Sequence, residues 1–517
     1  MQQLTALDDA TLQRELRQLV DAELLYQRGL PPRTTYQFKH ALIQDVAYES
    51  LLRQRRRALH GAIGQAIEAL EGERAVEQAA ILAYHYARST QQDKAVTYAL
   101  LAGDQAVRLH ARAEATTQYT QALSLAQGLP ASPEAQRLQI DAILKLAAVS
   151  VSREDMERDQ AQLAQAHALA ETLADEPRLA QVLYWQGRVA YVRGDLQTAI
   201  TYAEQSLALA DRLEDETLSA PPVNLLGRSY SLQWDAARGS QLMVRSTAQM
   251  HQIGNRVEEA TAAGYAAAAL GWRGEFTQAL AYSDRGVALA RELANPFAEA
   301  AALQYRGMVH DQQGAWTQAL ADFDAARRVA EGVGDHFRVY IVNIWEGWTY
   351  IRAGDPATGR DLLEQALAFA EQMGTLLFVA LGKAWLAACF LALGELDTVP
   401  ALCQEALQVA EETSDRFARA VAQRALAEVL TLETTPDRQQ AEQAMGEAIQ
   451  LWKEIEFRPE LARSYVCYAR LLQQWGQQDT AAHYLSEAIS MFQEMGMDWD
   501  LAQAEEVRRA LRSMDGR

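Results

Sequence analysis

The sequence predicts an all-α protein in which tandem pairs of antiparallel helices stack into an extended superhelix. Three observations predict this fold. An alanine-rich helical pattern fills most of the 517 residues. Small residues recur at the same distances on both sides of each turn. The turn glycines themselves recur at a period of 40 residues, at Gly274, Gly314, Gly354 and Gly394.

The N-terminal segment has a different pattern from the repeats. The stretch from Asp8 to Ala22 has helical spacing of its apolar residues, and a second helix follows His40. Between these helices, apolar and polar residues alternate on either side of "LPPR" (Leu30–Arg33), which predicts two short antiparallel strands joined by a turn. The alternating apolar residues are Leu24, Tyr26, Tyr36 and Phe38.

We expect the chain to divide into four segments. Residues 1–70 hold the helix, hairpin and helix described above. Residues 71–170 form atypical helical hairpins, in which small residues recur without strict spacing. Residues 171–495 form the regular superhelix. Residues 496–517 hold a final helix without a partner, which is typical of the cap on a solenoid.

The small residues of each regular unit explain where its two helices end and how closely they pack. The glycine ends the first helix, because a left-handed residue costs least without a side chain. An acidic residue such as Asp195, Glu275 or Asp355 then begins the second helix at its positive end. Alanines five and twelve residues after the turn form a narrow seam on the second helix. A small residue seven positions before the turn lets the paired helices approach closely: Gly187, Gly227, Ala267, Gly307, Gly347, Ala387 and Ala469.

This arrangement of small residues resembles the tetratricopeptide repeat over the stretch from Arg178 to Phe492. The period of 40 residues is longer than the period of about 34 in that family. We therefore expect longer helices. The resemblance implies a superhelix whose concave face binds a protein or peptide, or a small-molecule effector.

A second resemblance lies in "FKHALIQDVAYESLL", with Phe38, His40, Leu42, Ile43, Val46 and Tyr48 at the matching positions. This stretch is similar to the end of the winged-helix domain that closes the nucleotide-binding module of STAND-type signal-transduction ATPases, including bacterial ATPases fused to adenylate cyclases. The resemblance implies that residues 1–70 are a winged-helix remnant, and that His40 faces the nucleotide phosphates in a full-length parent. The alternative for His40 is a helix-starting residue packed against the hairpin.

The sequence lacks the phosphate-binding pattern G-x-x-x-x-G-K-[ST]. Its one Gly-Lys pair, Gly382-Lys383, lies inside a helical pattern. We therefore expect no enzymatic activity and no cofactor, because nothing would cradle the phosphates of ATP. The resemblance implies a sensor or scaffold array at the C-terminal end of a STAND-type ATPase. The alternatives are the regulatory part of an adenylate cyclase or ATPase enzyme, a free-standing tetratricopeptide adaptor, and a DNA-binding regulator of the STAND class.

Composition argues against several classes of partner. The net charge of -20 is unfavourable for binding nucleic acid. The arginines of residues 53–57 are either an anion-binding patch or a solvated helix face. The apolar stretch Gly374–Gly394 is in register with the repeats, so we expect a buried helix and no membrane span. The three cysteines within helical patterns and the N-terminus without a signal-peptide pattern predict a cytoplasmic protein.

Aromatic residues nine positions before the turn are the main candidates for a binding site: Trp185, Tyr265, Tyr305, Trp345 and Trp385. Leu225 interrupts the series. Either they form a ladder that is offered to a ligand, or they pack between successive first helices. Arg188, Arg228 and Trp348 lie one helical turn away and would help to line the same groove. No metal site is expected, because the nine histidines form no pair with a third ligand, and we find no catalytic constellation.

Overall fold

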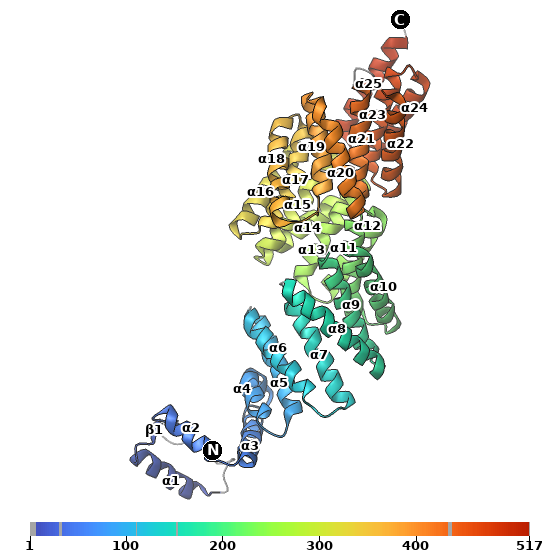
Figure 1. The fold of residues 1–517 in the computed structure, drawn as a ribbon. Coiled ribbons are helices and arrows are strands. Elements are labelled where there is room, and N and C mark those ends of the chain that lie inside the picture. The colour runs from blue at the N-terminus through green and yellow to red at the C-terminus, as the bar shows by residue number, and fades with distance from the viewer. Residues whose placement is uncertain (1–6, 30–33, 110, 151–152, 433–436, 516–517) are drawn as a thin grey trace. The chain divides into compact units, whose positions relative to one another are not determined.

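The computed structural model describes residues 7–29, 34–109, 111–150, 153–432 and 437–515 (Figure 1). The fold is all-α, as predicted, and antiparallel helix pairs follow one another along the chain. The chain splits into two compact units, Met1–Val189 and Ala190–Arg517, with the boundary inside α9 (Glu176–Val192). We describe each unit by itself, and the four segments drawn from the sequence stay a prediction.

Unit 1 begins in the expected order, with α1 (Asp9–Asp21), β1 (Leu25–Arg28), β2 (Thr35–Phe38) and α2 (Ala41–Glu49). The strands pair antiparallel, with Leu25 opposite Phe38. Leu25 packs against α1, whereas Tyr26 is exposed. The two expected antiparallel strands are therefore present, and the buried side of the first strand carries Leu25. The turn Leu30–Arg33 lies outside the described residues.

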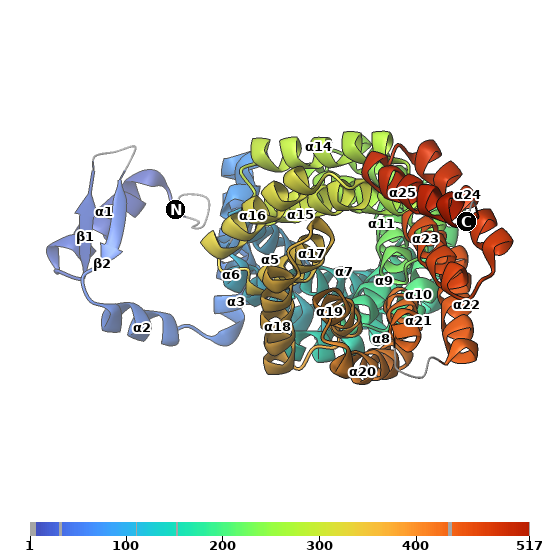
Figure 2. The ribbon, with the colours of Figure 1, turned by 90° about the horizontal axis from the view of Figure 1, so that it is seen from above.

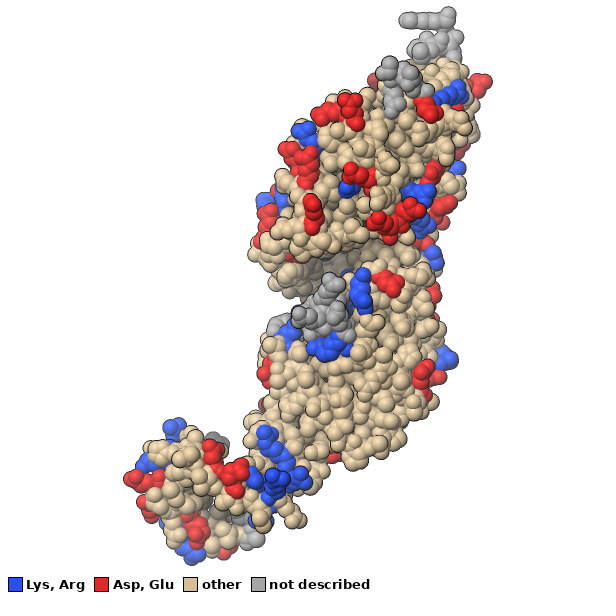
Figure 3. All heavy atoms as spheres, viewed as in Figure 1, with Lys and Arg blue, Asp and Glu red and all other residues tan. Residues whose placement is uncertain are grey.

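The rest of unit 1 is helical, with a 3₁₀ segment η2 (Gly72–Gln78) between its third and fourth helices. Basic side chains gather at the start of α3 (Figure 3). Arg53, Arg55 and Arg57 are exposed there, and Arg56 pairs with Glu49 at 2.8 Å. This arrangement fits the solvated-face alternative. The helices are α3 (Arg53–Glu71), α4 (Ala79–Ala87), α5 (Gln92–Arg108), α6 (Arg112–Gln127), α7 (Pro133–Val149), α8 (Arg153–Leu173) and the first part of α9.

Unit 2 consists of helix pairs followed by a last helix, α25 (Asp498–Asp515). The first helices after α9 are α11 (Glu216–Leu232), α13 (Arg256–Trp272), α15 (Pro296–Gln313), α17 (His336–Ala353), α19 (Val379–Leu393), α21 (Arg416–Leu432) and α23 (Arg458–Gln474). The second helices are α10 (Leu196–Arg212), α12 (Ala236–Gln252), α14 (Phe276–Glu292), α16 (Trp316–Gly332), α18 (Pro356–Met373), α20 (Val399–Thr413, preceded by the 3₁₀ turn η3, Leu396–Thr398), α22 (Arg438–Glu454) and α24 (Gln478–Met495).

The turns confirm the repeat and show that its elementary period is one helix. A residue with positive φ occurs every 20 residues from Ala174 to Ser414, alternately after a first and after a second helix. The predicted turn glycines all take this conformation, for example Gly354 at φ +95°. The Trp234 turn takes it without a glycine, at φ +60°. The next residue is often an Asp or Asn that caps the following helix through its side chain, as Asp195 does for α10.

Small residues set the spacing within each pair, as predicted. A Cβ added at Gly307 would lie 2.8 Å from the ring of Phe323, and one at Gly227 would lie 2.4 Å from the sulfur of Met243. The seam alanines of the second helices, such as Ala319 and Ala326, have no exposed surface. The first and second helices therefore meet at distances that a larger side chain would not allow.

Unit 2 curls until early and late helix pairs meet (Figures 1 and 2). A guanidinium nitrogen of Arg416 donates a hydrogen bond to the carbonyl of Gln233 at 3.0 Å, and Arg463 donates to the carbonyl of Gln312 at 2.7 Å. These partners are 183 and 151 residues apart in the sequence. Contacts across one superhelical turn therefore add to the contacts between neighbouring repeats.

The apolar stretch at α19 is a buried helix of this unit, as expected. Its residues Leu381 and Trp385 have no exposed surface. Among the residues that the structure describes, no helix has both the length and the apolar character that crossing a bilayer requires.

Candidate functional site

The candidate residues of unit 2 share one face of successive first helices, which we call the first-helix face. They lie nine or six positions before the turn, so that they project in similar directions from one helix to the next. The candidates on it are Arg228, Tyr265, Tyr305, Trp345, Trp348 and Trp385. The structure divides them into two groups with different surroundings.

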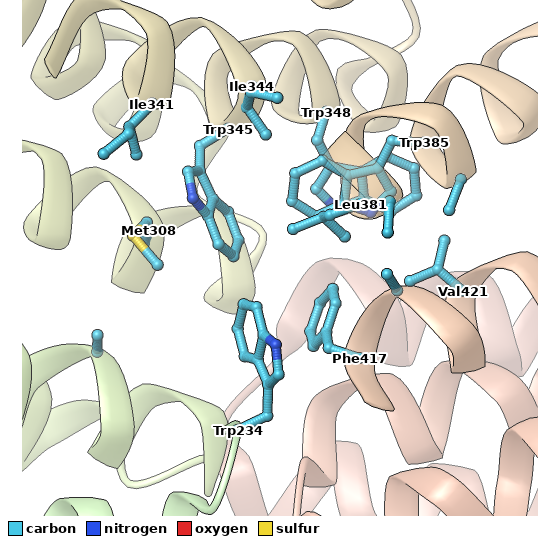
Figure 4. Close-up of a cluster of buried hydrophobic side chains, with 14 of the residues drawn as sticks. Trp234, Met308, Ile341, Ile344, Trp345, Trp348, Leu381, Trp385, Phe417 and Val421 are labelled. Atoms are coloured by element: carbon cyan, nitrogen blue, oxygen red, sulfur yellow. The ribbon is translucent and has the colours of Figure 1, made fainter. Parts of the chain in front are cut away.

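The tryptophans belong to an aromatic core, formed by Trp234, Trp345, Trp348, Trp385 and Phe417 (Figure 4). The rings of Trp345 and Trp385 meet edge to face with centres 4.9 Å apart, and Trp348 stacks on Trp385 at 5.2 Å. Trp234 and Phe417, which come from opposite sides of the superhelical turn, stack at 4.3 Å.

This packing closes the core to ligands. Trp345 is 1% exposed, Trp385 is 0% exposed and Trp348 is 7% exposed. The packing alternative therefore describes Trp345 and Trp385, and Trp348, which was expected to line a groove, is buried with them. The physical reason is the curl of unit 2, because it brings Phe417 and its neighbours over the rings.

The second group forms the Tyr–Arg cluster: Tyr191, Arg228, Tyr265, Tyr305 and Arg338, from α9, α11, α13, α15 and α17. The guanidinium carbon of Arg228 lies 5.5 Å from the ring centre of Tyr191 and 5.2 Å from that of Tyr265. The rings of Tyr265 and Tyr305 are 4.9 Å apart. All five side chains are half-buried, so they keep contact with solvent while neighbours fix their positions.

The two arginines dominate the electrostatics of this cluster. Burial alone would raise the pKa of Tyr265, but the charges of Arg228 and Arg338, together with hydrogen bonds from Tyr305 and Tyr191, lower that pKa to about 8. Burial raises the pKa of Tyr305, and the nearby Tyr265 raises it further. The cluster therefore presents guanidinium charge and the remaining phenol donor of Tyr265, and both interact favourably with an anion.

Arg338 is a member of the cluster that the sequence analysis missed. It lies seven residues before Trp345, so it shares the first-helix face two helical turns away. A search for charged residues at seven-residue spacing from the aromatic series would have found it. Its Nη1 donates to the amide oxygen of Gln304 at 2.7 Å.

The remaining sequence candidates lie in unit 1. Trp185 is half-buried and packs at the edge of the core formed by α5 to α9. Arg188 on α9 is also half-buried. His40 is exposed and precedes the first residue of α2, without a side-chain hydrogen bond to the helix end. The role of His40 as a nucleotide sensor stays a prediction.

A buried charge network lies near the aromatic core and joins distant helices. Glu460 accepts hydrogen bonds from Arg424 and Arg463 at 2.7 Å each. Arg463 also pairs with Asp500 at 2.9 Å. Arg352 pairs with buried Asp311 at 3.0 Å and reaches within 4.0 Å of Glu460. This network ties α15, α17, α21, α23 and α25 together, and every charge in it has a partner.

One shallow hollow of about 300 Å³ lies where the α13–α14 turn meets the α22–α23 turn. Its rim carries Arg273, Glu275, Lys453, Glu456 and Arg458. Arg273 lies within 3.9 Å of both glutamates. Arg458 is paired with Glu494 at 2.6 Å, so the two remaining cations of the rim and its two glutamates cancel.

Within the described ranges, no group of three or more His, Cys, Asp or Glu side chains could hold a metal ion. The cysteines Cys389, Cys403 and Cys467 are free. Burial raises the pKa of the Cys389 thiol to about 11, which makes it a poor nucleophile near neutral pH.

No protein-family model matches the chain. A stretch of 133 residues is 29% identical to an uncharacterized protein of Rhizobium meliloti (strain 1021), and the match covers 26% of this chain and 13% of that protein. Among solved structures, the chain is similar to a Signal Transduction ATPase with Numerous Domains (STAND) protein with a tetratricopeptide repeat sensor from Pyrococcus horikoshii. The TM-score is 0.50 at 12% identity, over 77% of this chain and 59% of that chain.

A further similar structure is the apo form of the quorum sensor NprR from B. thuringiensis, with a TM-score of 0.44 at 15% identity, over 66% of this chain and 97% of that chain. The likeness to the P. horikoshii structure agrees with the helix pairs described above: the fold is a tetratricopeptide-type superhelix. The chain spans less than two thirds of both the R. meliloti and the P. horikoshii proteins.

Proposed function

We propose that the chain is a non-catalytic binding array that serves as the sensor of a STAND-type signal-transduction ATPase. Its ligand is a protein or peptide, or a small-molecule effector, bound on the first-helix face at the Tyr–Arg cluster. The observation that carries this proposal is the convergence of five half-buried polar side chains from successive first helices. Such groups are held in place by the repeat and still reach solvent, as binding requires.

Two observations support the link to STAND proteins. The N-terminal stretch "FKHALIQDVAYESLL" resembles the joint of that family, and its helix, hairpin and helix occur in the order that the joint has. The P. horikoshii chain with a similar fold is described by its title as carrying its repeats as a sensor. In this role His40, exposed at the start of α2, is available to a nucleotide held by another domain.

Binding is tested by fractionating an extract of the source cells and following the melting temperature of the intact chain. A fraction that contains the ligand raises the melting temperature of the native chain, because ligands that bind only the folded state stabilise it. The same fraction has no effect on Tyr265→Ala. The matched control is Tyr282→Ala, which removes a half-buried tyrosine of α14 outside the cluster. A fraction that stabilises both variants equally places binding elsewhere. If no fraction stabilises the native chain, the binding array is contradicted.

The STAND assignment is tested separately, by sequencing the DNA upstream of the codon for Met1. A P-loop encoded in the same frame, or in an adjoining gene whose product binds this chain, supports it. A chain that functions alone, with no such partner, supports the free-standing adaptor instead. The purified chain is expected to hydrolyse no ATP above a buffer blank. Turnover that is lost in His40→Ala would overturn the non-catalytic assignment.

A further inference from the structure

The arginines of the Tyr–Arg cluster differ from the arginines that form the close ion pairs of unit 2. The chain has 68 acidic and 48 basic residues, so carboxylates are in excess. Several half-buried arginines of unit 2 lie within 3.0 Å of a carboxylate, among them those of the pairs Arg306–Asp322, Arg327–Glu346, Arg352–Asp311, Arg424–Glu460 and Arg463–Asp500. Three others, Arg273, Arg360 and Arg416, are half-buried without a carboxylate that close among the described residues, but the Nε–H of none of them is buried and unpaired.

Arg228 and Arg338 lack such a partner within the described part of the chain. The nearest carboxylate to Arg228 is that of Glu258, at 3.8 Å, which is beyond hydrogen-bond distance. Arg338 forms no ion pair with any described residue, and its Nη1 bonds only to the neutral amide of Gln304.

The Nε–H groups of the same two arginines are buried without a hydrogen-bond partner among the described residues. Buried donors are almost always paired in folded proteins, because an unpaired one loses its water without compensation. The Nε and Nη donors on one edge of a guanidinium form the fork that binds a carboxylate through two parallel hydrogen bonds. In Arg228 this fork lies beside the rings of Tyr191 and Tyr265.

We propose that the Tyr–Arg cluster binds a carboxylate group of the ligand, with Arg228 as its principal partner and the hydroxyl of Tyr265 as a further donor. This proposal rests on the proposed function and specifies the chemistry of its ligand. Arg338 adds positive charge to the same site. Glu258, whose side chain is 40% exposed, is a weak internal competitor that the ligand displaces.

Charge balance favours a carboxylate over a phosphate. The two guanidiniums and the carboxylate of Glu258 leave a local excess of one positive charge. A carboxylate brings one negative charge and neutralises it. A phosphate monoester brings about −1.5 to −2 and would leave negative charge without a partner in a half-buried site. The carboxylate can belong to a small organic acid or to a peptide, since both present the same group.

The test uses the full chain with benzoate as the probe, and benzamide and inorganic phosphate as comparisons, followed by calorimetry. Benzoate is expected to bind, while benzamide and phosphate bind at least about tenfold more weakly. Benzamide lacks the negative charge, and phosphate brings more negative charge than the site neutralises. Arg228→Gln is expected to weaken benzoate binding about tenfold or more. Glu258→Gln is expected to strengthen it severalfold, since the internal competitor is lost.

The matched control is Arg256→Gln, which removes an exposed arginine of α13 that pairs with Glu292 outside the cluster. It is expected to leave benzoate binding unchanged. Circular dichroism of each variant shows whether the helices are intact. Equal binding of benzoate and benzamide, or equal losses in Arg228→Gln and Arg256→Gln, would overturn the proposal. Because Glu258→Gln is expected to gain affinity, unfolding cannot imitate its result.

The source of the carboxylate is tested with peptides that carry a free or an amidated C-terminus. Preference for the free form assigns a peptide carboxylate, and indifference together with benzoate binding assigns a small acid. Failure of these probes is distinguishable from failure of the proposed function. If the stabilising extract fraction still requires Tyr265 but contains no carboxylate, the binding array stands and the carboxylate proposal falls.

Discussion

The aromatic core and the Tyr–Arg cluster occupy the same register of the repeat and yet have opposite surroundings. Trp345 and Trp385 lie nine residues before their turns and are buried, whereas Tyr265 and Tyr305 hold the same position in earlier repeats and are half-buried. The difference arises across the superhelical turn. Phe417 reaches the tryptophans from a later repeat, and Trp234 stacks on it at 4.3 Å.

The comparison shows that repeat register alone does not determine whether a side chain can bind a ligand. Within one repeat, the position fixes the direction of a side chain. Whether the side chain is exposed or buried depends on which distant repeat packs over it. The early first helices therefore supply a polar surface, and the later ones supply an apolar core. The predictions below test this division.

The largest expected effect is the loss of a core ring. Trp385→Ala should lower the free energy of unfolding by about 3–5 kcal/mol, because it removes a fully buried indole and leaves a cavity. Tyr265→Ala, at the same register, should cost only about 1 kcal/mol, since the tyrosine is half-buried. Urea unfolding followed by circular dichroism measures both. Trp499→Ala, which alters an exposed ring of α25, is the control and should have little effect. Equal costs at positions 385 and 265 would remove the distinction between the regions.

A slightly smaller effect is expected from a substitution in the buried charge network, which joins early and late helices of unit 2. Glu460→Gln should cost about 3 kcal/mol, because it leaves the buried guanidiniums of Arg424 and Arg463 without their shared carboxylate. Acrylamide quenching of tryptophan fluorescence should rise as the core opens. Glu292→Gln, at an exposed ion pair with Arg256, should change stability by less than about 0.5 kcal/mol.

The same network predicts a pH dependence. Burial alone would raise the pKa of Glu460, but Arg424, Arg463 and Arg352 lower it to about 2. Its folded-state pKa is thus below the unfolded value, so its contribution to stability is complete above about pH 4.5 and is lost as the pH falls toward 2. Glu460→Gln should flatten the loss of stability over this range. An acid-unfolding curve that the substitution leaves unchanged would contradict this assignment.

A third effect distinguishes the cluster from the core by its titration. Tyr265 should ionise near pH 8, because Arg228 and Arg338 stabilise the phenolate. Arg228→Gln should raise this pKa by about one unit or more, which corresponds to about 1.4 kcal/mol. The ultraviolet absorbance of tyrosinate measures the change. Tyr265→Phe should abolish the step near pH 8. If Arg256→Gln raises the pKa of Tyr265 as far as Arg228→Gln does, the net charge of the chain and not the cluster sets this pKa.

Much of the fold could be predicted from the sequence, because small residues at turns and seams act locally. The glycines at 274, 314, 354 and 394 take the left-handed conformation that the pattern requires. The burial of Trp345 and Trp385 could not be predicted in the same way, since it depends on Phe417 in a later repeat. Arg338 was missed for a simpler reason, because the aromatic series was extended only by one helical turn toward the loop, to Arg188, Arg228 and Trp348, and not by two turns in the other direction. Trp234 shows both effects: it takes the left-handed conformation of the regular turns, but its place in the core depends on its contact with Phe417.

The smallest predicted effect concerns the turns, which the two regions share. Glu214 precedes the helix that carries Arg228, and Ser414 precedes the helix that carries Phe417. Both are exposed and left-handed, with φ of +53° and +56°. Since a side chain in this conformation costs about 1 kcal/mol, Glu214→Gly and Ser414→Gly should each stabilise the chain by about 0.5–1 kcal/mol.

Equal gains at these two turns would show that local geometry is the same in both regions and that long-range packing alone makes them different. Urea midpoints measure the gains. The control is Gln205→Gly in the exposed middle of α10, which should cost about 1 kcal/mol because glycine weakens a helix interior. If Glu214→Gly is stabilising but Ser414→Gly is destabilising, the late turn is held by packing as well, and the contrast between the regions extends to their turns.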